Sequence, residues 1–282
     1  MNLVNGVFEI AESFMRDSEF VFLDYEEIDE VSKKMIDTGV QKFPPQFEKS
    51  EYIKNIMMEF VGDSINYCYW YGTSNIRPGG ASSGLMYKLV EKAFDDWTWM
   101  NHGRCINNLI RLLAENRFPL LEERIRHLKE LAKEETVEFI NKCSEGTYFE
   151  KRFDYLISNF PGYASDIFLK RASLFFIQLF RKFGLYEEEM HIIHVPADYQ
   201  VPKLLEHHGC IIYSDDLLMM IENNVLIPKH SKIECEIRAA TVLACRELVK
   251  NTGWNIADVD GWFWLRRKEV TTPFHLTITT DY

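Results

Sequence analysis

Apolar residues recur at spacings of three and four positions in one segment after another of this chain. Val7, Ala11 and Phe14 follow this spacing near the beginning, and it returns many times later. Such a period places the apolar side chains on one face of an α-helix. Alternation with a period of two, which is typical of a strand at the edge of a sheet, is clearest over Phe274–Thr279. The pattern therefore predicts a mainly α-helical protein with little β-structure.

Turn and capping residues divide this pattern into separate helices. Ser82 or Ser83 can begin one helix and Ser165 or Asp166 another, and Gly184 is suited to end the latter. His191–Val195 is consistent with either a short strand or an extended connection. The expected helices are Val7–Met15, Tyr25–Met35, Leu85–Phe94, Cys105–Leu113, Leu121–Asn141, Tyr148–Ile157, Phe168–Phe183, Val201–His208, Asp215–Glu222, Ile233–Lys250 and Ile256–Arg267.

The composition is that of a globular protein with one large core. Of the 282 residues, 46% are hydrophobic and 27% are charged, and no Gly, Ser or Pro-rich stretch is long enough to be a linker. We therefore expect one domain over residues 1–282. The charged run Leu121–Asn141 is typical of a solvated helix face.

Charge and cysteine usage restrict the classes of partner. The formal net charge of −11 repels phosphate backbones, so we expect no stable nucleic-acid partner. The first 20 residues lack a basic leader, and the longest apolar run, near Leu174–Phe180, is too short to span a bilayer. Six scattered cysteines resemble neither a zinc site nor a secreted disulfide framework. These features favour a soluble protein of the reducing cytoplasm without a membrane partner.

Several motifs of catalysis are absent from the sequence. It contains no P-loop, no Gly-x-Gly-x-x-Gly and no Gly-x-Ser-x-Gly. The adjacent pair His207 and His208 has no partner spaced as in His-Glu-x-x-His, so we expect no metal site. We also expect no organic cofactor.

One carboxylate occupies an unusual setting in the stretch Ile192–Pro202. β-branched residues precede Asp198, and prolines at 196 and 202 restrict the backbone on both sides. Two interpretations remain open. Asp198 can cap the following helix, or it can be a functional carboxylate in an apolar pocket.

The segment Asp63–Trp70 combines an acid, an amide and three large aromatic rings. A flat heteroaromatic ligand requires such a mixture, because rings stack on it while polar groups bind its edge. Aromatic side chains at this density also form ordinary core, and Trp262–Trp264 allows the same two interpretations. Lys170 can bind an anion near a helix start or lie in solvent, and Glu234, Glu236 and Arg238 can form a structural ion pair.

Six motifs, in this order along the chain, resemble the queuosine salvage protein family, whose members act as queuosine 5′-monophosphate N-glycosidases. The resemblance covers nearly the whole chain and continues to Pro273–His275 and Asp281–Tyr282. The motifs are Asp63–Trp70, Asn159–Tyr163, Leu169–Ala172, Ala197–Pro202, Tyr213–Leu217 and Glu234–Arg238.

The resemblance implies a helical fold akin to the helix-hairpin-helix DNA glycosylases, with a lysine and an aspartate facing the sugar. Lys170 and Asp198 are the matching positions, so we expect both to be catalytic. A fixed carboxylate stabilises the oxocarbenium character that develops at C1′ and can take a proton from the attacking water. The expected substrate-binding residues are Asp63, Asn66, Tyr67, Tyr69, Trp70, Tyr199, Glu236, Arg238 and Trp264.

The sequence departs from the family pattern at one position in this region. Gln200 stands where the resemblance implies an arginine after the Asp-Tyr pair. If that arginine binds the phosphate or orients the acid, then Lys203 or Arg238 must take over its role.

The implied function is hydrolysis of queuosine 5′-monophosphate by a monomer, with queuine as the product for salvage into tRNA modification. Queuine carries a secondary amine that is cationic at neutral pH, so Glu236 or Asp63 would favour it over guanine. Two alternatives stay open: a non-catalytic module that binds a nucleobase, and a nucleic-acid binder similar to a DNA glycosylase. Release of free base separates the first alternative from the enzyme, and salt-sensitive duplex binding identifies the second.

Overall fold

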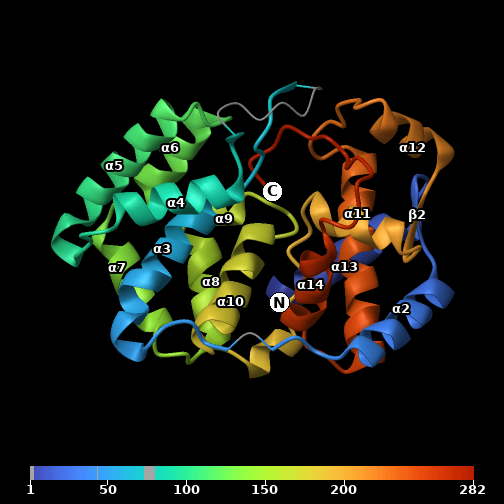
Figure 1. Cartoon of the computed structure of the whole chain (residues 1–282), viewed down its shortest axis with the longest axis horizontal. Helices are drawn as coiled ribbons and strands as arrows, with labels where there is room; N and C mark the ends of the chain where they lie inside the picture. Colours follow the sequence, from blue (N-terminus) through green and yellow to red (C-terminus); the bar gives the residue numbers. More distant parts are fainter. Residues whose placement is uncertain (1–2, 43, 73–79) are drawn as a thin grey trace. The chain divides into compact units, whose positions relative to one another are not determined.

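A computed structural model describes residues 3–42, 44–72 and 80–282, and these residues are mainly helical (Figure 1). They form two compact units. The first unit comprises Met1–Phe43 and Glu188–Ile278, and the second comprises Pro44–Glu187 and Thr279–Tyr282. The single domain over 1–282 and the likeness to DNA glycosylases stay predictions.

The first unit is built around α13 (Lys232–Thr252), against which four other helices of the unit pack. Its two short strands pair antiparallel, with Phe22 opposite Ile212. The other elements are α1 (Leu3–Arg16), β1 (Val21–Leu23), α2 (Tyr25–Thr38), η5 (Glu188–His191), α11 (Gln200–His207), β2 (Ile211–Tyr213), α12 (Asp215–Glu222) and α14 (Ile256–Arg266).

The sequence of α13 explains its central position. Ser231 caps it by accepting from the backbone N–H of Glu234, and Gly253 ends it with a φ of 71°. Every residue from Glu234 to Cys245 is buried, including the small residues Ala240 and Ala244. A helix that is buried on all sides must be surrounded by other elements, and α1, α2, α11 and α14 pack on it.

The second unit has an aromatic core between α3 and α10, which lie side by side (Figure 1). The ring of Phe60 contacts those of Phe139, Phe160, Tyr163 and Phe175 at centroid distances of 5.0–5.5 Å. The elements are η1 (Lys49–Glu51), α3 (Tyr52–Ser64), α4 (Ser83–Ala93), η4 (Trp99–Asn101), α5 (His102–Glu115), α6 (Leu121–Glu130), α7 (Glu134–Cys143), α8 (Phe149–Asn159), α9 (Pro161–Ala164) and α10 (Lys170–Phe183).

The prediction of a mainly helical protein is confirmed, and so are several helix ends. Ser82 accepts from the backbone N–H of Leu85 at the start of α4, and Gly184 ends α10 with a φ of 68°. Asp166 accepts from the N–H of Lys170 at 2.8 Å. Pro78-Gly79-Gly80 in the sequence also predicts a turn, which lies mostly outside the described residues.

Two local predictions were wrong. The run Leu121–Asn141 is two helices, because the chain turns after the buried Leu131, and its Arg124 is buried rather than solvated. Phe274–Thr279 forms no strand, since only Leu276 makes an isolated bridge, to Leu226. Of the two alternatives for His191–Val195, the strand is not formed, and the segment after η5, which ends at His191, is a connection without regular secondary structure.

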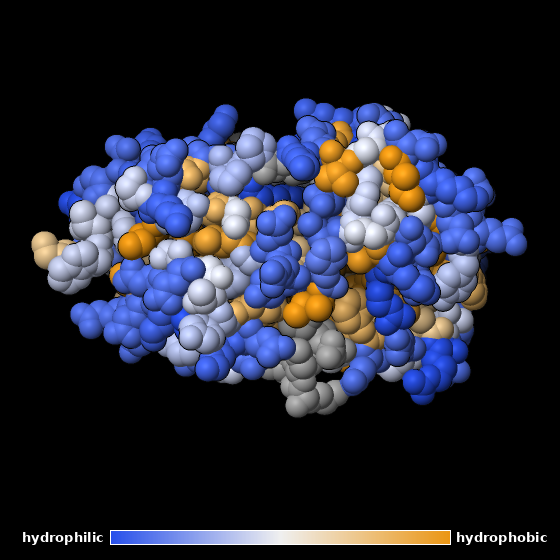
Figure 2. Space-filling model, turned by 90° about the horizontal axis from the view of Figure 1, so that it is seen from below, coloured by the Kyte–Doolittle hydropathy of each residue, from blue (hydrophilic) through white to orange (hydrophobic). Residues whose placement is uncertain are grey.

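Hydrophilic residues cover most of the molecular face in Figure 2, where hydrophobic residues form small separate groups. Over the described residues, the structure contains no helix with the length and apolar character needed to cross a membrane.

Candidate functional site

Asp63 lies in the last turn of α3 and is fully buried. The hydroxyl of Tyr87 donates to its Oδ1 at 2.6 Å. Gly62 makes this approach possible, because a Cβ at that position would overlap the ring of Tyr87. Burial, and next the neighbouring Glu59, raise the pKa of Asp63 to about 7, whereas the Tyr87 hydrogen bond and Lys170 lower it. At neutral pH this carboxyl group can therefore donate as well as accept a hydrogen bond.

Replacing Asp63 with asparagine should remove a pH dependence of stability. The folded protein keeps a proton on Asp63 up to about pH 7, whereas the unfolded chain loses it near about pH 4. The folded state thus binds the extra proton between these values, so its free energy of unfolding falls as the pH rises through them. Thermal unfolding at pH 5 and pH 8 should show a smaller difference in Tm for Asp63→Asn than for the wild type.

A matched control is Asp95→Asn, which changes an exposed aspartate of the same unit. Asp95→Asn should keep the wild-type difference in Tm. If Asp63→Asn showed the same difference in Tm between pH 5 and pH 8 as the wild type, the pKa of Asp63 would not be raised by folding.

Asn66 follows α3 and is half-buried. The hydroxyl of Tyr69 donates to Asn66 Oδ1 at 2.8 Å, which fixes the orientation of the amide. The NH₂ group is then the part of this side chain that can donate to a ligand. Tyr69 thus acts on Asn66 through its hydroxyl, beyond the stacking role that its sequence suggested.

The rings of Tyr67, Tyr69 and Trp70 are at most 2% exposed. Tyr67 Oη lies 3.2 Å from His127 Nδ1, and the guanidinium of Arg124 lies 4.4 Å from the centre of the Tyr67 ring. This burial favours the alternative that the sequence left open, in which the rings belong to the core. Stacking of any of them on a ligand stays a prediction.

Lys170 is the first residue of α10, and it is only 4% exposed. Leu169 precedes it with a φ of 47°, a backbone conformation that non-glycine residues rarely adopt. Lys170 Nζ donates to the backbone carbonyl of Asn66 at 3.0 Å. The structure therefore brings the predicted lysine next to the predicted Asn66, and Lys170 does not lie in solvent.

Asp198 is held by the start of α11. Its Oδ1 accepts from the backbone N–H groups of Gln200 at 2.7 Å and Val201 at 3.2 Å. The capping interpretation is thus confirmed. It does not exclude a functional carboxylate, because both capping bonds go to Oδ1 and fix the group in place.

Arg238 supports the backbone next to Asp198. The side chain is fully buried on α13, its Nε donates to Ala197 O at 3.0 Å, and its Nη1 lies 3.5 Å from Glu234 Oε1. The structural Glu–Arg pair considered from the sequence is present. Arg238 is therefore suited to position the chain before Asp198.

Glu236 is fully buried and is bound by the chain that leads into β1. Its carboxylate accepts from the backbone N–H groups of Glu19, Phe20 and Val21 at 2.8–3.2 Å. These bonds give Glu236 a structural role, so we do not include it in the proposed binding site. The sequence could not reveal this role, because backbone partners leave no side-chain signature.

Two predicted aromatic residues of the first unit have ring contacts of different kinds. The ring of Tyr199 contacts that of Phe274 at a centroid distance of 4.6 Å. Trp264 is 50% exposed, and the guanidinium of Arg267 on the same helical end covers its ring. Tyr199, the residue after Asp198, thus packs against Phe274, whereas Trp264 is a surface residue.

The two candidates to replace the arginine missing at Gln200 both donate to backbone carbonyls. Lys203 Nζ donates to Val270 O at 3.0 Å, and Arg238 donates to Ala197 O. Lys203 also lines a small pocket of about 90 Å³, whose carboxylates Glu206 and Glu222 would repel a phosphate. Neither residue has the geometry of a dedicated phosphate site.

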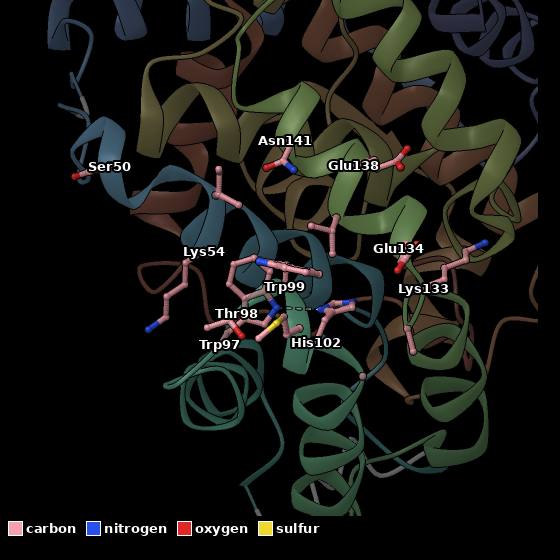
Figure 3. Close-up of a pocket in the computed structure, with 15 residues that line it drawn as sticks. Ser50, Lys54, Trp97, Thr98, Trp99, His102, Lys133, Glu134, Glu138 and Asn141 are labelled. Carbon is pink, nitrogen blue, oxygen red and sulfur yellow. Dashed lines mark hydrogen bonds between the residues drawn. The ribbon is translucent and has the colours of Figure 1, made fainter.

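A larger pocket of about 1030 Å³ opens beside η4 in the second unit, where Trp97, Trp99 and His102 line it (Figure 3). The indole N–H of Trp97 donates to His102 Nδ1 at 3.1 Å, and His102 Nε2 lies 2.7 Å from Leu131 O. Burial lowers the pKa of His102, so its ring is neutral and structural. None of the predicted site residues lines this pocket, and we assign it no part in the reaction.

Sequence reasoning missed several residues that surround the predicted ones. Glu59 and Tyr87 determine the environment of Asp63, and two buried arginines, Arg124 and Arg171, contact the segment after α3. Arg171 had a signal, since it is part of the motif Leu169–Ala172. Arg124 had none, because it lies within a run of charged residues that resembles a solvated helix.

The chain is similar to known proteins over nearly its full length. The model of the queuosine salvage protein family matches residues 91–280. A protein of Sphaerobacter thermophilus named queuosine 5′-phosphate N-glycosylase/hydrolase is 23% identical over 98% of this chain and 98% of its own length. Proteins of the same name from Dictyostelium discoideum and Mus musculus are 26% and 25% identical, over 79% and 68% of this chain and 76% and 66% of their own lengths. This chain belongs to the queuosine salvage protein family.

Proposed function

We propose that this protein is an enzyme that hydrolyses the N-glycosidic bond of queuosine 5′-monophosphate and releases queuine. The observation that carries the proposal is the S. thermophilus relative with this activity in its name, which spans 98% of both chains. The fixed geometry of Asp198 gives the proposal a chemical basis.

Asp198 is the proposed catalytic carboxylate, which stabilises charge and acts as a general base. Cleavage develops positive charge at C1′ of the ribose, and a carboxylate held in one orientation stabilises that charge without reorganising. Asp198 can also take a proton from the attacking water, whose oxygen bonds to C1′ as the bond to the base breaks. The base leaves with a proton on its glycosidic nitrogen, which balances the hydrolysis.

The leaving base is the part of the substrate that Asp63 and Asn66 are proposed to bind. A 7-deazaguanine has carbon in place of N7, so the usual site of purine protonation is missing. Departure of the base must then depend on hydrogen bonds to the edge of its pyrimidine ring. Asp63, with a pKa of about 7, and the oriented amide of Asn66 can supply them.

Lys170 is the proposed second catalytic residue, and its cation can act on the sugar or on the 5′-phosphate. It is buried and held by Asn66 O, so its charge has a defined position. A fixed cation of this kind uses binding energy remote from the reacting bond to orient the substrate. No metal or organic cofactor is part of the proposed mechanism.

The proposed setting is a cytoplasmic monomer that acts on a small molecule and has no stable nucleic-acid partner. The net charge of −11 supports the exclusion of nucleic acids. The six cysteines are reduced and buried, which suits a reducing compartment.

The function is tested by incubating the purified protein with queuosine 5′-monophosphate in water enriched in ¹⁸O. Mass spectrometry should detect free queuine without label and ribose 5-phosphate with one ¹⁸O atom, because the water oxygen adds to C1′. Guanosine 5′-monophosphate is the matched control substrate and should release much less base.

Two outcomes would contradict the proposal. Binding of queuine without release of base would identify a non-catalytic nucleobase-binding protein. Salt-sensitive binding of duplex DNA without release of queuine would favour a nucleic-acid binder.

A further inference from the structure

Five consecutive backbone carbonyls, beginning at the last residue of α3, accept hydrogen bonds from three buried cations. We call the stretch Ser64–Trp70 the aromatic segment. Arg171 donates to the first carbonyl, Lys170 to the third, and Arg124 to the second, fourth and fifth. The accepting residues are Ser64, Ile65, Asn66, Tyr67 and Cys68.

Arg124 makes most of these contacts, although it comes from a different helix. Its Nη2 donates to Tyr67 O at 2.6 Å and to Cys68 O at 2.7 Å, and its Nε donates to Pro119 O at 2.7 Å. The side chain is 0% exposed. Its partners are carbonyl groups and the faces of aromatic rings, with no carboxylate among the described hydrogen-bond partners. A buried charge is costly, so this arrangement implies that the carbonyl positions matter.

The aromatic segment is also strained. Cys68 has a φ of 23°, which lies in the left-handed region that non-glycine residues rarely adopt. Its carbonyl is bound by Arg124, and its N–H donates to Tyr282 O at 2.9 Å. Backbone strain persists only where the surroundings enforce it, and it concentrates at functional sites.

We propose that Arg124 and Tyr69 are positioning residues that present the Asn66 amide to the base of the substrate. Arg124 fixes the backbone on the C-terminal side of Asn66, and the Tyr69 hydroxyl fixes the amide itself. Neither residue needs to touch the base for this role. The inference rests on the proposed function and deepens it. It assigns recognition of the deazapurine edge to the aromatic segment, whose conformation Arg124 and Tyr69 fix.

The first test is Arg124→Lys, with Arg126→Gln as the control on the same helix, since Arg126 is exposed. Lysine keeps the charge but cannot reach several carbonyls at once. The Kd for queuine and the KM for queuosine 5′-monophosphate should each rise at least about tenfold, as expected when hydrogen bonds to a charged group are lost. The kcat should change much less, because Asp198 has its own anchors in the first unit.

Circular dichroism and thermal unfolding show whether Arg124→Lys is folded. A merely structural role would lower Tm and leave the KM and Kd of the folded protein at wild-type values, and this result would overturn the inference. If Arg124→Lys does not unfold cooperatively, Tyr69→Phe decides, because it removes only the hydroxyl that orients Asn66. A raised Kd for queuine in Tyr69→Phe would support the inference, and an unchanged Kd would overturn it.

The wild-type protein separates this inference from the proposed function. Release of queuine by the wild type together with unchanged KM and Kd in the variants would overturn the positioning role alone. A wild type that neither binds nor releases queuine would overturn both.

Discussion

Asp198→Asn is expected to lower the rate of queuine release by at least about 10²-fold while the protein stays folded. The substitution removes the negative charge that stabilises the developing oxocarbenium ion and the group that takes a proton from water. It keeps the Oδ1 acceptor for the N–H groups of Gln200 and Val201, and asparagine caps helices as well as aspartate does. Single-turnover release of queuine measures the chemical step, and thermal unfolding checks the fold.

Asp24→Asn is the matched control for this experiment. Asp24 caps α2 in the same way, because its Oδ1 accepts from the N–H groups of Glu26 and Glu27, and it is half-buried like Asp198. Both variants should unfold near the wild-type temperature, whereas only Asp198→Asn should lose activity. If Asp198→Asn released queuine at the wild-type rate, Asp198 would have only a capping role and no catalytic one.

Lys170→Met is expected to lower kcat/KM for queuosine 5′-monophosphate by about 10²-fold, which corresponds to the loss of roughly 3 kcal/mol of interaction with a charged group. Methionine has a similar length and can occupy the buried position, but it carries no charge and cannot donate to Asn66 O. Steady-state kinetics measure the loss. Comparing the nucleotide with the nucleoside would locate the cation, because a phosphate anchor affects only the nucleotide.

Lys54→Met controls for the loss of a lysine that donates to a backbone carbonyl. Lys54 lies on α3 in the same unit, and its Nζ donates to Asp95 O. This variant should keep wild-type kinetics. Equal losses in both variants, or none in Lys170→Met, would show that Lys170 has no specific part in the reaction.

Periodicity predicted the helices well where caps and apolar spacing agreed. The predicted helix Asp215–Glu222 has the bounds of α12, and Ile256–Arg267 extends one residue beyond α14. The turn between α6 and α7 was missed because Leu131–Lys133 contains neither glycine nor proline. At this turn Leu131 is buried and its carbonyl lies 2.7 Å from His102 Nε2, a tertiary contact that the apolar spacing does not reveal.

The candidate site was predictable only where side chains carry the chemistry. Asp198 and Lys170 stood out by motif, and the structure gives each of them defined partners. The roles of Glu236 and Arg124 could not be predicted, because both side chains bind main-chain atoms far away in sequence. Such contacts depend on the fold, because every residue type can supply a backbone carbonyl and every type except proline can supply an N–H.

The order of the chain has a consequence for how the protein forms during translation. Helices α1 and α2 pack on α13, and β1 pairs with β2, so the first unit closes only after the chain of most of the second unit, which lies between them in sequence, has been made. The apolar faces of α1 and α2 stay exposed until α13 is made, while most of the second unit is already available to fold. Nascent chains stopped before α13 should therefore be the forms that depend most on chaperones.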